Sequence, residues 1–123
     1  MVKERRPKIL QGMTYEIKTG CGALHIIIND RNNIPYELFS VMGKGGGCAS
    51  SQCEALGRVI SLSFKNDVPV KDLIKHLSGI SCHSPVIGDE KVSSCSDAIA
   101  QVLKMYLVDK EKIEKEKADK ENK

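Results

Sequence analysis

The sequence predicts an α+β domain in which a three-stranded antiparallel β-meander is followed by three helices packed on one face of the sheet. Three observations predict this fold. The N-terminal part contains short runs that alternate in hydropathy or are rich in β-branched residues. The connections between these runs are short, which is typical of antiparallel neighbours. The remainder carries apolar residues at helical spacing.

The three predicted strands cover residues 13–18, 23–29 and 34–42. The first alternates in hydropathy, and the second, ALHIIIN, is β-branched and apolar enough to be buried on at least one face. Thr19-Gly20-Cys21-Gly22 and Asp30-Arg31-Asn32-Asn33 are turn sequences between the strands. The strands therefore pair as consecutive hairpins.

The first predicted helix follows the glycine-rich residues 43–47 and ends near Lys65. Ser51 and Glu54 stand at capping-box spacing, which predicts that the helix starts at Ser51. Its apolar residues form one stripe and a flanking one, and this wide apolar arc predicts a central helix. The stripe consists of Cys53, Leu56, Ile60 and Phe64, and the flank of Ala55, Val59 and Leu62.

Two further helices are predicted from about Pro69 to Leu77 and from Ser94 to Val108. Proline is favoured in a first turn, and Gly79 suits the C-terminal cap of the shorter helix. Ser94 is the expected N-cap of the longer one, with Asp97 at the third helical position. The apolar pattern stops after Val108.

These elements divide the chain into a basic extended arm (1–11), a folded domain (12–108) and a charged tail (109–123) that is either helical or disordered. Residues 2–8 alone account for the net charge of +3, so the arm is a candidate contact for nucleic acid or an acidic partner. A solubilising terminus is the simpler interpretation. No signal peptide and no membrane-spanning apolar run are recognisable, which predicts a cytoplasmic protein with reduced thiols.

Four of the five cysteines are expected at the ends of elements rather than within them. Cys21 lies in the first turn, Cys48 precedes the first helix, Cys82 follows the second helix and Cys95 opens the third. Unpaired N–H groups and the macrodipole at a helix N-terminus favour a thiolate, which is the form that binds metal. Cys53, in contrast, lies on the apolar stripe and is interpreted as a packing residue.

The residues leave several interpretations of this constellation open. Four thiolates suit tetrahedral Zn²⁺ or an iron–sulfur centre, but no C-x₂-C knuckle is present, and buried or reactive free thiols are the alternative. A redox pair of Cys48 and Cys53 lacks a C-x-x-C motif. The glycine-rich loop does not have the residue order of a P-loop, and His83 beside Cys82 is expected to be exposed. No hydrolase triad is visible.

Four motifs, RPKILQGMTYEIKTGCGALHI, GKGGGCASSQCEALGRVISL, HLSGISC and SSCSDAIAQVL, resemble the TSCPD domain in the order that this family has them. That domain occurs at the C-terminus of adenosylcobalamin-dependent (class II) ribonucleotide reductases and as short stand-alone proteins. The naming motif appears as Ser93-Ser94-Cys95-Ser96-Asp97, with serine in place of threonine and of proline. By position, the resemblance assigns the family's cysteines to Cys21, Cys48, Cys82 and Cys95 and leaves out Cys53.

The predicted fold also resembles U-type iron–sulfur scaffold proteins. This sequence differs from them in its additional Cys21 and in Ser50, which replaces an aspartate. A fourth thiolate would close the coordination sphere, and a closed sphere favours structural zinc over a cluster that is handed on.

The resemblance implies an accessory zinc-binding domain connected with deoxyribonucleotide synthesis, with adenosylcobalamin entering only through a separate reductase chain. The chain is too short to contain the catalytic barrel of such an enzyme, so we expect no catalysis by this chain alone. The alternatives are an iron–sulfur scaffold or carrier and a nucleic-acid or protein interaction module that uses the basic arm.

Overall fold

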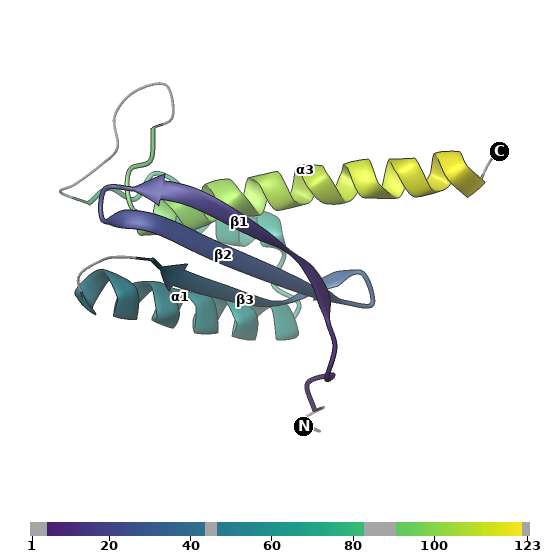
Figure 1. Ribbon diagram of the computed structural model, residues 1–123, viewed down its shortest axis with the longest axis horizontal. Helices are drawn as coiled ribbons and strands as arrows, with labels where there is room; N and C mark the ends of the chain where they lie inside the picture. The colour runs from purple at the N-terminus through teal and green to yellow at the C-terminus, as the bar shows by residue number, and fades with distance from the viewer. Residues whose placement is uncertain (1–4, 44–46, 83–90, 122–123) are drawn as a thin grey trace.

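The computed structural model describes residues 5–43, 47–82 and 91–121, and at Gly47 and Cys48 it describes the course of the backbone only. The predictions for the first four residues, for glycines 45 and 46, for His83 and for the loop 83–90 lie outside these described residues. The elements are, in order, β1 Gln11–Thr19, β2 Gly22–Arg31, β3 Ile34–Met42, α1 Gly47–Lys65, α2 Val70–Leu77 and α3 Cys95–Glu121. The predicted α+β class is confirmed (Figure 1).

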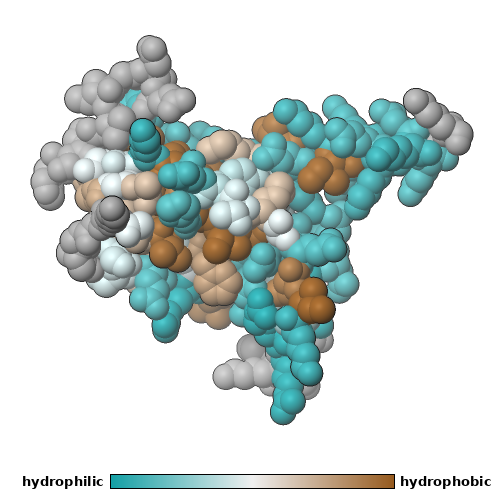
Figure 2. Space-filling view, in the orientation of Figure 1, coloured by the Kyte–Doolittle hydropathy of each residue, from teal (hydrophilic) through white to brown (hydrophobic). Residues whose placement is uncertain are grey.

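The sheet has the order β1-β2-β3 with both pairs antiparallel. Asn32 and Asn33 join β2 to β3 with φ angles of 53° and 65°, the left-handed conformation that a two-residue hairpin turn of type I′ requires. Alternate residues of β2 face the core, and Leu24, Ile26 and Ile28 are fully buried. The opposite face is open, where Phe39 remains 46% exposed, and Figure 2 shows apolar side chains on it.

Helix α1 lies along β3 and closes the outer edge of this strand (Figure 1). The Ser61 hydroxyl accepts the Leu38 N–H at 2.9 Å and donates to the Leu38 carbonyl oxygen at 3.1 Å. Gly57 allows this approach, since a Cβ there would stand 3.1 Å from the same carbonyl oxygen. The outward N–H and C=O groups of Leu38, in the middle of this edge, are therefore satisfied from within the chain.

Two details of the α1 prediction are wrong. The helix begins at Gly47, so Ser51 is in its second turn and does not cap it. The predicted stripe does face the core, but the flank does not, because Val59 and Leu62 are 58% and 61% exposed. The helix covers the border of the sheet and leaves one side in solvent, so it is not central.

The two later helices pack on the core face of the sheet (Figure 1). Ser94 caps α3 as predicted, because its Oγ accepts the Asp97 N–H at 3.0 Å. Gly79 follows α2 with a φ of 78°. Helix α3 continues beyond Val108 to Glu121, so the tail is helical and does not fray where the apolar pattern stops.

The first turns of this tail contact the sheet. Asp109 accepts a hydrogen bond from the Tyr15 hydroxyl at 2.8 Å, and Lys110 pairs with Asp30 at 2.8 Å. These two contacts fix the beginning of the tail against the sheet. No helix among residues 5–43, 47–82 and 91–121 is both long and apolar enough to cross a membrane.

Candidate metal centre

The segments that carry the cysteines meet at one end of the sheet. The turn between β1 and β2, the last residues of β3 and the first turns of α1 and α3 lie at this end (Figure 1). Gly43 N–H donates to the Ala23 carbonyl oxygen at 2.9 Å and continues the β2–β3 ladder toward the start of α1. As predicted, Cys21 is in the turn and Cys95 is the first residue of α3. Cys48 was expected to precede the first helix, but α1 begins one residue earlier, at Gly47, so Cys48 is its second residue.

Thr19 connects the first of these segments to the last. Its Oγ1 accepts the Cys21 N–H at 3.1 Å and donates to the Gly22 carbonyl oxygen at 2.8 Å, which fixes the turn. The same oxygen lies 3.9 Å from Cys95 Sγ, which donates a weak hydrogen bond to it. A threonine at the end of a strand gave no sequence signal for this role.

A second set of contacts positions Cys82 relative to α3. The Cys82 N–H donates to the Ser93 carbonyl oxygen at 2.9 Å. Asp97 in turn accepts the N–H groups of Gly79 at 2.8 Å and Ser93 at 3.0 Å, so the end of α2 is tied to the start of α3. The backbone of Cys82 therefore lies beside Ser93, two residues before the start of α3 at Cys95.

The carboxylate of Asp97 is held in its charged form. Burial would raise the pKa of this group, but the N–H donors of Gly79 and Ser93, with the amide of Gln101, outweigh burial and lower it. The sequence predicted Asp97 only as a residue of the first helical turn. Its long-range role of joining the two helices is a finding of the structure.

Cys53 lies in the core beside these cysteines. It is fully buried, which confirms its predicted packing role. Burial raises the pKa of the Cys53 thiol to about 12, and the neighbouring Cys95 and Cys21 add to this increase. A thiol with such a pKa remains protonated at neutral pH in the absence of a metal ion. Burial among apolar side chains therefore distinguishes Cys53 from the exposed Cys21 and the half-buried Cys82 and Cys95.

The described part of the chain does not contain a complete metal site. Within residues 5–43, 47–82 and 91–121, no three His, Cys, Asp or Glu side chains stand close enough together to hold an ion. Cys21 is exposed, Cys82 and Cys95 are half-buried, and the side chain of Cys48 lies outside the description. The donor set still fits Zn²⁺, because four thiolates are a usual structural zinc site, and three of the four thiols belong to segments that contact one another.

The basic arm is attached to the open face of the sheet. Arg6 binds the Glu37 carboxylate through Nε at 3.0 Å and through Nη2 at 2.6 Å. Hydrogen bonding to Arg6 lowers the pKa of Glu37, against the opposing effect of burial. Arg5 and Lys8 are exposed on either side of this ion pair. The arm thus keeps exposed cations for a partner, and its predicted nucleic-acid contact stays a prediction.

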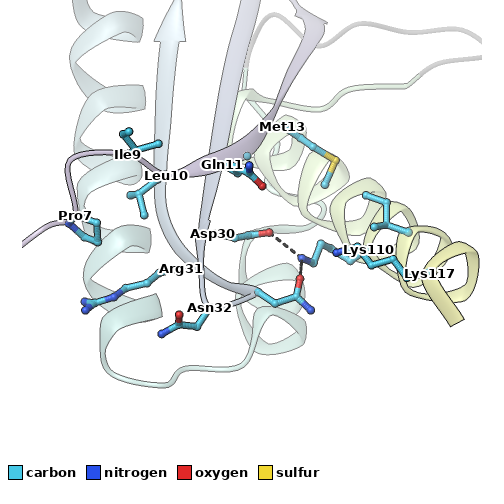
Figure 3. Close-up of a pocket in the computed structure, with 13 residues that line it drawn as sticks. Pro7, Ile9, Leu10, Gln11, Met13, Asp30, Arg31, Asn32, Lys110 and Lys117 are labelled. Atoms are coloured by element: carbon cyan, nitrogen blue, oxygen red, sulfur yellow. Dashed lines mark hydrogen bonds and ion pairs between the residues drawn. The ribbon is translucent and has the colours of Figure 1, made fainter. Parts of the chain in front are cut away.

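The end of the sheet opposite the cysteines has a pocket of about 630 Å³. It lies between the arm, the start of β1, the β2–β3 turn and the extension of α3 (Figure 3). Arg31, Lys110 and Lys117 are its basic residues, and Figure 3 shows Lys110 reaching Asp30. The Tyr106 hydroxyl donates to the other oxygen of Asp30 at 2.6 Å. Asp30 therefore joins β2 to α3 at this end.

The TSCPD domain family matches residues 1–107 of the chain. This range includes all five cysteines, the arm and α3 as far as its last buried turn. No curated protein and no solved structure matches the chain.

Proposed function

Because the chain belongs to the TSCPD domain family, which is associated with the C-terminus of ribonucleotide reductases, we propose that it is a zinc-binding accessory module of ribonucleotide reduction. In this proposal Cys21, Cys48, Cys82 and Cys95 hold one Zn²⁺. The zinc is structural, and the module acts beside a separate reductase chain.

The observation that supports the metal site is the meeting of three cysteine segments around Thr19 and Ser93. Thr19 Oγ1 contacts the Cys21 backbone and the Cys95 thiol, and Ser93 contacts the Cys82 backbone. These segments are distant in sequence, and these polar contacts, together with the packing of Cys95 against the core, bring them together at one end of the sheet. A shared ligand would give this end the cross-link that its hydrogen bonds provide only weakly.

The first turns of α1 and α3 suit such a ligand. Cys95 occupies the first position of α3, where free N–H groups and the helix dipole stabilise a thiolate. Cys48 is the second residue of α1, and the same argument applies to it. Bound Zn²⁺ would cross-link the four cysteine segments without redox chemistry of its own.

The connection with a reductase rests on the family. These residues form one α+β domain, so in this proposal ribonucleotide reduction and adenosylcobalamin binding belong to a catalytic chain outside them. The proposal predicts that the module binds the catalytic chain of a class II reductase and alters its activity. Ribonucleotide reduction by the isolated module would contradict it.

The test of the metal site is elemental analysis of the purified protein and of five single variants. We expect one zinc per chain in the unmodified protein and loss of this zinc in Cys21→Ser, Cys48→Ser, Cys82→Ser and Cys95→Ser. Cys53→Ala is the matched control, because it removes a neighbouring thiol and should keep the zinc. Zinc retained in any of the four variants would contradict the ligand set. Iron with visible absorbance after anaerobic reconstitution would favour the iron–sulfur alternative.

A further inference from the structure

The two edges of the sheet are treated differently by the fold. The outer edge of β3 is closed by α1 through Ser61 and Leu38. The outer edge of β1 has no such cover, since no hydrogen bond among the described residues reaches its backbone between Gly12 and Lys18 from outside the sheet. An exposed strand edge with free N–H and C=O groups is a template for pairing with another strand.

The register of the first hairpin shows which groups are free. Thr19 and Gly22 flank a two-residue turn, so they exchange both of their backbone hydrogen bonds. By alternation, the N–H and C=O groups of Lys18, Glu16 and Thr14 point away from β2. The side chains of these three residues are exposed. The free edge is therefore regular and polar and contains no proline.

The core is also incomplete beside this edge. Met13, Tyr15 and Ile17 are only half-buried, although their partners in β2 are fully buried. On the neighbouring flank of α3, Met105 and Val108 are 41% and 51% exposed and line a depression of about 380 Å³. This flank adjoins β1, because Asp109 within it accepts the Tyr15 hydroxyl. A strand added to β1 would cover these apolar groups.

The charges of β1 point to a second copy of the same chain as this strand. We propose that β1 pairs antiparallel with β1 of a second copy, with Ile17 opposite its own symmetry mate. In this register Glu16 stands opposite Lys18 of the partner copy, and Lys18 opposite its Glu16, so both pairs are attractive. Both residues have outward backbone groups, so each pair exchanges two hydrogen bonds.

Neighbouring registers are less favourable. If one strand slides by two residues, Glu16 stands opposite Glu16 of the partner copy at the two-fold axis. If it slides by two more, Glu16 and Lys18 are no longer opposite each other. Glu16 remains available for the contact, since it is 62% exposed and its ion pair with His25 is long, at 3.8 Å. The preferred register joins two three-stranded sheets into one of six strands and places Met105 of each copy along the shared boundary.

The experiment is sedimentation velocity of the zinc-loaded full chain over a concentration series, with reductant present to prevent disulfides through the exposed Cys21. We expect a reversible monomer–dimer equilibrium. Glu16→Lys and Lys18→Glu each place two like-charge pairs in the interface and should raise the dissociation constant about tenfold or more. The double variant E16K/K18E exchanges the two charges and should return the dissociation constant to that of the unmodified protein.

Mixing the two single variants gives the sharpest result. A Glu16→Lys chain opposite a Lys18→Glu chain has only attractive pairs, so a heterodimer should form where neither variant dimerises alone. Lys71→Glu on the exposed side of α2 is the control, since it changes the net charge as Lys18→Glu does and should leave dimerisation unchanged. A monomeric unmodified protein, single variants that dimerise normally, or no heterodimer in the mixture would each overturn the proposal.

Discussion

At the end of the sheet that carries the β2–β3 turn, Asp30 accepts hydrogen bonds from Tyr106 at 2.6 Å and from Lys110 at 2.8 Å. At the opposite end, the described contact between the β1–β2 turn and α3 is the 3.9 Å approach of Cys95 Sγ to Thr19. The first end has short, charge-assisted hydrogen bonds between the sheet and α3, whereas the second has a weak thiol donor beside the packing of Cys95 against the core. The Asp97 network does not remove this difference, because it joins α2 to α3 rather than either helix to the sheet.

This comparison indicates what each end needs from outside the chain. At the Asp30 end the acceptor and both donors come from the chain itself, and burial together with hydrogen bonding to Asp30 raises the pKa of Tyr106. At the cysteine end, the side chain of α3 that contacts the sheet is the thiol of Cys95, whereas at the other end it is the Tyr106 hydroxyl and the Lys110 ammonium that contact Asp30. The proposed zinc would therefore stabilise the two ends unequally.

Removal of zinc by a chelator should give the largest effect. We expect the free energy of unfolding to fall by about 5 kcal/mol or more, because binding of a structural zinc contributes directly to folding. Hydrogen exchange should increase first at residues 19–23 and 91–96 and least at residues 28–36. An equal increase at both ends, measured by mass spectrometry, would contradict the difference drawn between them.

Asp30→Ala should break the other end. It leaves the buried Tyr106 hydroxyl and the Lys110 ammonium without their shared acceptor, so we expect a loss of about 2–4 kcal/mol in urea denaturation at fixed protein concentration. Zinc content should not change. Asp119→Ala, on the exposed tail of α3, is the matched control and should shift the midpoint little. Loss of zinc in Asp30→Ala would show that the two ends are coupled.

Glu37→Gln should give the smallest effect, and one that depends on pH. Hydrogen bonding to Arg6 lowers the pKa of Glu37 in the folded protein, so its charged form stabilises the fold above its unfolded pKa of about 4.3. This contribution is lost as pH falls through the folded pKa. The variant should be less stable by about 1 kcal/mol at pH 7. The difference should shrink at pH 3, whereas Glu54→Gln should show little difference at either pH.

The sequence predicted the elements that depend on local patterns. The bounds of β3, the buried stripe that includes Cys53 and Ile60, and the Ser94 cap all follow from periodicity and capping chemistry. The start of α1 did not follow, because the Ser51–Glu54 spacing imitates a capping box one turn inside the helix.

The candidate site was predictable only in part. The positions of the cysteines at element ends could be read from turns and helix starts, but the proximity of Cys53 to Cys95 could not, because periodicity does not show which elements face each other. The same holds for Asp30, whose partner Tyr106 is 76 residues away. Thr19 contacts Cys95 over the same separation of 76 residues.

The closure of β3 by Ser61 has a consequence for the order in which the chain assembles. Leu38 and Ser61 are 23 residues apart, whereas Asp30 and Tyr106 are 76 apart. Closing the shorter loop costs about 1 kcal/mol less conformational entropy. The β2–β3 hairpin and α1 can therefore form a native-like unit before α3 is available, including during synthesis on the ribosome. In such an early unit the future docking surface for α3 is still exposed, and α3 arrives last to cover it.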